Sequence, residues 1–152
     1  MKKRILINIL CIFIILSFSI GMTEAAESSS SYSGASSWAV PELDRAAGYG
    51  FITGRIKDNM SSNITREEFA EIAVRFYEVY TGLNAEPGNA KFSDTSNPEI
   101  LKAANLGLTT GIGDGKFGPK ALVTREQIAT MLLRALKVIR PEGDFTVTGS
   151  DK

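Results

Sequence analysis

The sequence lacks histidine altogether, and its single cysteine, Cys11, lies in an apolar N-terminal stretch. Without imidazole or thiol groups beyond that stretch, most zinc sites and the usual nucleophile–base triads cannot be built. An excess of charge of one sign is also missing. The 152 residues carry 17 basic and 17 acidic side chains, so electrostatics does not point to nucleic acid as a partner. These absences weigh against an enzyme and favour a protein that binds or builds structure.

The N-terminus has the features of a secretory signal peptide. Three basic residues follow Met1, residues 5–20 are almost continuously apolar, and Thr23 and Ala25 place small residues before a cut after Ala25. The apolar run falls short of the about 20 residues that a transmembrane helix needs. We therefore favour cleavage of residues 1–25 over retention as a membrane anchor. The exported part then holds 14 basic and 16 acidic residues.

Residues 26–36 are rich in serine, which predicts a flexible linker. Beyond it the sequence repeats itself. The segment from Pro41 to Gly54 matches the segment from Pro98 to Gly111 with an offset of 57, and the copies continue to matching Thr-Arg-Glu triplets with an offset of 59. We assign repeat 1 to residues 37–83, a linker to 84–91 and repeat 2 to 92–141. Residues 142–152 are expected to be a disordered tail or the start of a lost third repeat.

Each repeat predicts a short helix, a loop and a long helix. Gly50 and Gly107 are expected to end the short helices in a left-handed cap. The threonine of each triplet, with Glu68 or Gln127 three residues later, predicts a capping box at the start of the long helix. Apolar stripes follow at helical spacing: Phe69, Ile72, Ala73, Phe76 and Tyr80, then Ile128, Met131, Leu132, Ala135, Leu136 and Ile139. One helix pair cannot cover such a stripe, so the repeats should pack together in an all-α fold.

These residues resemble the S-layer homology (SLH) family. Its pattern has an aromatic or Trp-Ala opening, a short helix ending in glycine, a Gly-Asp-Gly-x-Phe-x-Pro loop and a Thr-Arg-Glu start to the long helix. Repeat 1 offers Trp38-Ala39, and repeat 2 offers the loop from Gly113 to Pro119; both contain the triplet. The resemblance covers about residues 37–140. It implies a non-catalytic module without cofactors that attaches a secreted protein to the bacterial cell wall.

The resemblance also implies a ligand and a site. In similar domains three repeats form a three-pronged spindle, whose grooves bind secondary cell-wall polysaccharides that often carry acidic pyruvate ketals. Carried over to this sequence, Arg66 and Arg125 would bind the anion, with Gly54, Gly111 and Trp38 lining the sites. The fork of an arginine matches a carboxylate with two parallel hydrogen bonds. Alternatively the arginines hold loop carbonyls, and Trp38 closes one end of the core.

The sequence departs from the family pattern in three respects. Trp38 aligns with Thr95, the first loop lacks the Gly-Asp-Gly segment, and a third repeat is missing. These departures leave other functions open: a homo-oligomer, a chain that completes a partner's SLH bundle, or a truncated fragment that does not bind.

Two further patterns in repeat 2 have ordinary structural explanations. Residues 113–118 fit G-x-G-x-x-G formally, but no strand precedes them, so dinucleotide binding is not favoured. Asp94 and Asp114 lack the spacing of a calcium loop and are interpreted as turn residues. We therefore predict neither a nucleotide site nor a metal site.

Overall fold

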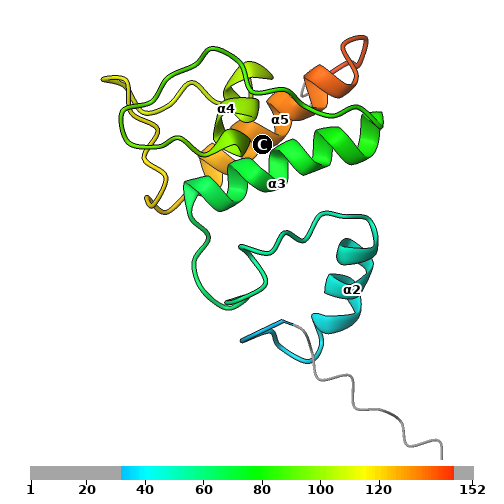
Figure 1. Ribbon diagram of the computed structural model, residues 1–152. Coiled ribbons are helices and arrows are strands. Elements are labelled where there is room, and N and C mark those ends of the chain that lie inside the picture. Colours follow the sequence, from blue (N-terminus) through cyan, green and yellow to red (C-terminus); the bar gives the residue numbers. More distant parts are fainter. Residues whose placement is uncertain (1–31, 146–152) are drawn as a thin grey trace, which may run out of the picture. The chain divides into compact units, whose positions relative to one another are not determined.

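The computed structural model describes residues 32–145, which form four helices and no sheet. The helices are α2 (Val40–Gly48), α3 (Arg66–Thr81), α4 (Pro98–Asn105) and α5 (Arg125–Ile139), as Figure 1 shows. The predicted all-α fold is therefore confirmed for this part of the chain. None of these helices is long and apolar enough to cross a membrane. The predicted signal peptide, and most of the tail predicted from residue 142, lie outside the described residues.

The helix ends follow from the sequence signals. Thr65 and Thr124 each form a complete capping box with the residue three positions later. After α2, Gly50 has φ +80° and its N–H donates to Ala47 O, while the next N–H donates to Ala46 O. The same pair of bonds ends α4 around Gly107. Glycine takes this left-handed conformation without strain, so both predicted caps are confirmed.

The core lies between α3 and the two helices of repeat 2. Helix α3 packs on both α4 and α5, which lie beside it in Figure 1. The repeats therefore pack on each other, as the uncovered stripes predicted. The buried apolar residues of this cluster come from α3, the linker, α4, the repeat 2 loop and α5: Phe69, Ala70, Ala73, Val74, Ala85, Ile100, Ala103, Leu108, Phe117, Met131 and Ala135.

The buried stripes are rotated from the predicted ones. In α3, Ala70 and Val74 are completely buried, whereas Tyr80 is 58% exposed. In α5, Leu132 is 37% exposed although it was expected in the stripe, and Met131 and Ala135 supply the buried face. The reason is that each helix is buried where it meets its neighbours: α3 on the side that faces repeat 2, and α5 on the side that faces α3. Helical spacing alone does not specify which side meets the neighbour.

Two segments assigned as linkers make specific contacts. Tyr32, in the Ser-rich segment, is buried and donates its hydroxyl to Leu43 O. In the segment between the repeats, Ala85 joins the core, and its N–H donates to a Glu78 carboxylate oxygen. The Ala85 contacts fix the start of the segment that leads from α3 to repeat 2.

Candidate ligand groove between the repeats

Arg66 is one of the residues that link the two repeats through polar contacts. It begins α3 in repeat 1, but its guanidinium enters the loop after α4 in repeat 2. There Nη2 donates to Thr109 Oγ1 over 2.9 Å and to Gly111 O over 3.3 Å. The guanidinium carbon also lies 5.0 Å from the centre of the Phe117 ring, within range of a cation–π interaction. The side chain is only 7% exposed.

The loop that receives Arg66 is a tight turn in which glycine is required. Asp114 and Gly115 both have positive φ, +51° and +66°, as in the mirror-image turns that join hairpins. Across that turn Ile112 N–H donates to Lys116 O over 2.9 Å. At Gly111, φ is +83° and a Cβ would lie 2.5 Å from Lys116 O. A side chain at position 111 would therefore push apart the loop that carries the arginine's acceptors.

Asp94 holds the far side of this loop. Its carboxylate accepts the N–H groups of Phe117 and Gly118, each over 2.8 Å. These two hydrogen bonds stabilise the charged form and lower the pKa of Asp94 below its ordinary value. The bonds support the interpretation of Asp94 as a turn residue. They also place the buried Phe117 ring under the guanidinium of Arg66.

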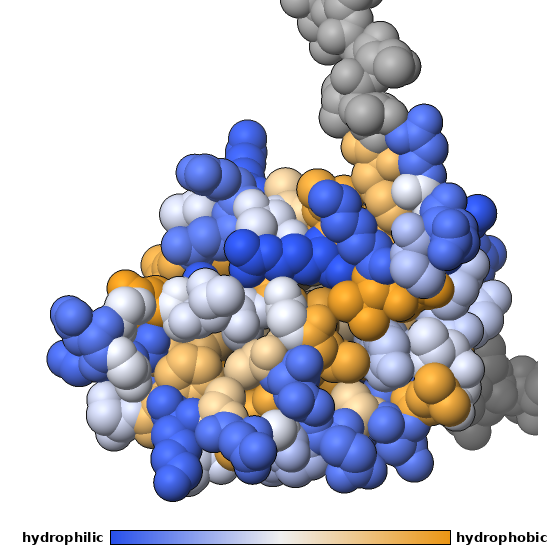
Figure 2. All heavy atoms as spheres, turned by 90° about the horizontal axis from the view of Figure 1, so that it is seen from above, coloured by the Kyte–Doolittle hydropathy of each residue, from blue (hydrophilic) through white to orange (hydrophobic). Residues whose placement is uncertain are grey.

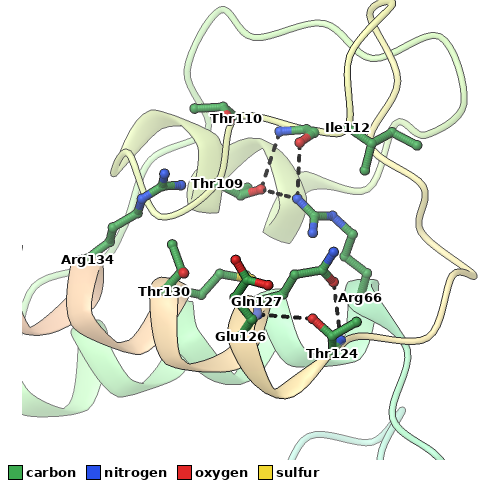
Figure 3. A pocket seen from close by; sticks show the side chains of 11 residues that line it. Arg66, Thr109, Thr110, Ile112, Thr124, Glu126, Gln127, Thr130 and Arg134 are labelled. Carbon is green, nitrogen blue, oxygen red and sulfur yellow. Dashed lines mark hydrogen bonds between the residues drawn. The ribbon is translucent and has the colours of Figure 1, made fainter.

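Beside Arg66 an open groove of about 500 Å³ separates the loop from α5. Figure 3 shows Arg134, Thr130 and Glu126 extending from α5, with Arg66 entering from the other side. The groove is lined by residues of α3, of the loop after α4, and of α5 with its cap: Arg66, Thr109, Thr110, Gly111, Ile112, Thr124, Glu126, Gln127, Thr130, Met131 and Arg134. Hydroxyl, amide and guanidinium groups dominate this lining, so a polar ligand fits it best.

The groove has an excess of positive charge. Two arginines and one carboxylate, that of Glu126, line it. Arg66 Nε is buried without a hydrogen-bond partner among the described residues. Burial first, and then repulsion from Arg134, lower the pKa of Arg66 from its ordinary value. An arginine remains charged nonetheless, and a ligand anion in the groove would relieve the repulsion between the two arginines.

The structure brings together two of the five residues predicted for the site. Arg66 and Gly111 meet at the groove, where Arg66 contacts a loop carbonyl as well as lining the cavity. Arg125 is exposed at the start of α5 and does not line this groove. Trp38, 79% exposed, precedes α2, and Gly54 lies exposed in the repeat 1 loop; neither lines the groove.

Several lining residues were not singled out from the sequence, above all Arg134. Its Nη1 donates to Leu108 O over 3.4 Å, which orients the side chain across the groove. Glu126, Thr130 and Arg134 are spaced four residues apart, a pattern that places them on one face of a helix. That pattern was visible in the sequence. However, Arg75 occupies the matching position in α3 and pairs with Glu78 outside the groove, so spacing alone does not identify the functional copy.

A comparison with protein families identifies part of repeat 2. Residues 91–129, which span α4, the loop and the start of α5, match the family model of the S-layer homology domain. The chain carries an S-layer homology domain. Such domains attach proteins to cell walls and bind cell-wall polysaccharides. Within the described residues, no cluster of histidine, cysteine, aspartate or glutamate could hold a metal ion.

Similar curated proteins are much longer than this chain. The chain is 31% identical to an endoglucanase of Bacillus sp. (strain KSM-635), over 75% of this chain and 16% of the relative. It is 33% identical to exoglucanase XynX of Acetivibrio thermocellus, over 66% and 10%. An amylopullulanase of Thermoanaerobacterium thermosulfurigenes is 30% identical, over 66% and 6%. The chain spans only these small parts of the relatives, and no solved structure matches it significantly.

Proposed function

We propose that this protein is a non-catalytic wall-binding module whose inter-repeat groove holds an acidic cell-wall polysaccharide. The protein would thereby be attached to the surface of the bacterium that secretes it. The observation that carries the proposal is the pair Arg66 and Arg134, which face one groove between the repeats with a single carboxylate beside them. A pyruvate ketal or uronate carboxylate has the charge and the planar shape that an arginine fork recognises.

The remaining lining suits the sugar part of such a polymer. The Thr109, Thr110 and Thr130 hydroxyls can both donate and accept hydrogen bonds with ring hydroxyls, and Glu126 can accept them. An open groove accepts a chain that continues at both ends, whereas an enclosed cavity would accept only a small molecule. The SLH match supports the same ligand class.

The groove does not support hydrolysis of the sugar. Glycosidases normally use two carboxylates that flank the scissile bond, and Glu126 is the one carboxylate among the lining residues. The glucanase and pullulanase names belong to relatives of which this chain covers 16% or less. We therefore propose that the module holds a polymer without cleaving it.

Co-sedimentation with isolated cell walls tests the proposal. Residues 32–152 should pellet with native walls and remain in solution with walls stripped of their acidic polymers. Arg134→Ala should reduce retention by at least about tenfold, since a charge-assisted hydrogen bond contributes roughly 1.5–3 kcal/mol. Arg75→Ala is the matched control: it removes an arginine from the same position of the other long helix, outside the groove.

Two results would contradict the proposal. Equal retention on native and stripped walls would show that the acidic polymer is not the ligand. Equal losses for the Arg134 and Arg75 variants would show that general surface charge, and not this groove, causes retention. Circular dichroism of each variant separates a lost contact from lost helix.

A further inference from the structure

The two long helices bury different faces although their sequences match. Ala73 and Val74 of α3 are completely buried, at 0% exposure each. The residues 59 positions later in α5 are Leu132 and Leu133, which are 37% and 40% exposed. Ala129, the counterpart of buried Ala70, is exposed as well. We call the exposed residues Arg125, Ala129, Leu132 and Leu133 the outer face of α5.

In repeat 1 it is the short helix, and not the long one, whose apolar residues are less buried than their counterparts. The apolar residues on and just after α4 are completely buried because α4 packs on α3: Ile100, Ala103 and Leu108. Their counterparts 57 positions earlier are only partly buried: Leu43, Ala46 and Phe51. Helix α2 packs on none of the other described helices. We call Leu43, Ala46 and Phe51 the open face of repeat 1.

The contact between α3 and α4 within one chain shows how these two faces fit together. It joins one side of the first long helix to the short helix of the next repeat, and is therefore a contact between two different surfaces. Contacts of this kind connect copies head to tail. The outer face of α5 matches the first surface, and the open face of repeat 1 matches the second. Figure 2 shows apolar side chains reaching the surface in separate groups among hydrophilic ones on the face seen there.

Polar groups at the same places are also complementary. Arg66 is buried in the repeat 2 loop, but its counterpart Arg125 is exposed, and the Arg125 side chain makes no hydrogen bond or ion pair to the rest of the described chain. In the repeat 1 loop, Thr53 is 9% exposed and its Oγ1 has no partner among the described residues. Thr53 lies one position beyond the counterpart of Thr109, which accepts a hydrogen bond from Arg66. A buried hydroxyl without a partner is costly, so a donor that enters this loop would stabilise it.

We infer that two copies of this chain associate head to tail. The outer face of α5 in one copy packs on the open face of repeat 1 in the other, and Arg125 donates to the loop that holds Thr53. The partner is a second copy because this chain carries both halves of the contact: the outer face of α5 is the counterpart of buried residues of α3, and the open face of repeat 1 is the counterpart of buried residues on and just after α4. The association is separate from the polysaccharide groove and does not depend on ligand binding.

Analytical ultracentrifugation over a range of concentrations tests this inference. The described residues 32–145 belong to one compact unit, which contains the whole described core. The apparent mass of residues 32–152 should rise with concentration to at least twice that of one chain. Leu133→Glu should raise the apparent dissociation constant by at least about tenfold, because it places a charge in an apolar contact. Val138→Glu is the matched control, since Val138 is 39% exposed on the same helix and its counterpart Val79 is 40% exposed.

A mixing experiment distinguishes head-to-tail contact from other association. Ala46→Arg blocks the open face of repeat 1, so alone it too should have an apparent dissociation constant raised by at least about tenfold. When the Leu133→Glu and Ala46→Arg variants are mixed, each keeps the face that the other has lost, and a complex of two chains should form. Circular dichroism should show the same helix content in all variants.

Three results would overturn the inference. The first is a wild-type chain that stays monomeric at every concentration. The second is an equal effect of Val138→Glu and Leu133→Glu. The third is a mixture of the two blocked variants that stays monomeric while the wild type associates. None of these results bears on the wall-binding proposal, because retention on walls is measured separately.

Discussion

Arg66 and Arg125 occupy the same position in two matching triplets, yet the structure gives them different surroundings. Arg66 is buried between the repeats, and Arg125 is exposed at the start of α5. The difference arises because the surroundings of each arginine come from the repeat that follows it, not from its own triplet. The sequence could therefore predict that an arginine of this motif contacts a loop. It could not predict which of the two arginines makes that contact.

Gly111 permits a specific test at the same scale. Gly111→Ala should lower the free energy of unfolding by about 1–3 kcal/mol, since it places a Cβ against Lys116 O in a left-handed conformation. The free energy can be measured by urea denaturation followed by circular dichroism. Retention on cell walls should fall as well, because the loop carries the acceptors of Arg66.

Gly54→Ala is the natural control for this substitution. Gly54 is the counterpart of Gly111, has no positive φ, and a Cβ there would meet nothing within 4 Å. The variant should retain its stability or gain slightly, because alanine restricts the unfolded chain more than glycine does. Equal destabilisation at both positions would contradict the assigned role of Gly111.

At the scale of helices, the sequence predicted where a helix begins and ends better than it predicted which side of the helix is buried. The capping boxes and the left-handed caps were visible because each depends on residues within a few positions of one another. The buried sides of α3 and α5 were only partly predicted. Tyr80 and Leu132 continue a helical stripe but lie at the surface, since burial depends on where a distant segment packs.

The two capping threonines should contribute unequally to stability. Thr65→Ala and Thr124→Ala should each lower the free energy of unfolding by about 1 kcal/mol. The Thr65 loss should be the larger, because the Thr65 hydroxyl also donates to the charged Glu68 carboxylate over 2.8 Å, whereas the Thr124 hydroxyl only accepts the Gln127 N–H over 3.2 Å. Chemical denaturation of both variants measures the difference. A larger loss for Thr124→Ala would contradict this reasoning.

At the scale of the whole molecule, both proposed activities depend on how one repeat meets the next. The groove exists because Arg66 of repeat 1 meets the loop of repeat 2 beside α5. Two of its residues, Arg66 and Gly111, were predicted from the family pattern. Arg134 was not, since its role depends on α5 lying across from that loop. A repeated sequence specifies the unit, whereas the functional surface comes from contacts between units.

Mapping where a purified acidic wall polysaccharide binds tests the central claim most directly. In an NMR titration of isotope-labelled residues 32–152, the account predicts that amide signals of Thr109–Ile112 and Gln127–Arg134 shift together. Signals of the repeat 1 cavity around Ile56 and Met60, which has a similar volume of about 530 Å³, should stay unchanged. Shifts concentrated in that cavity, or no shifts while the polymer is in excess, would contradict a ligand site between the repeats.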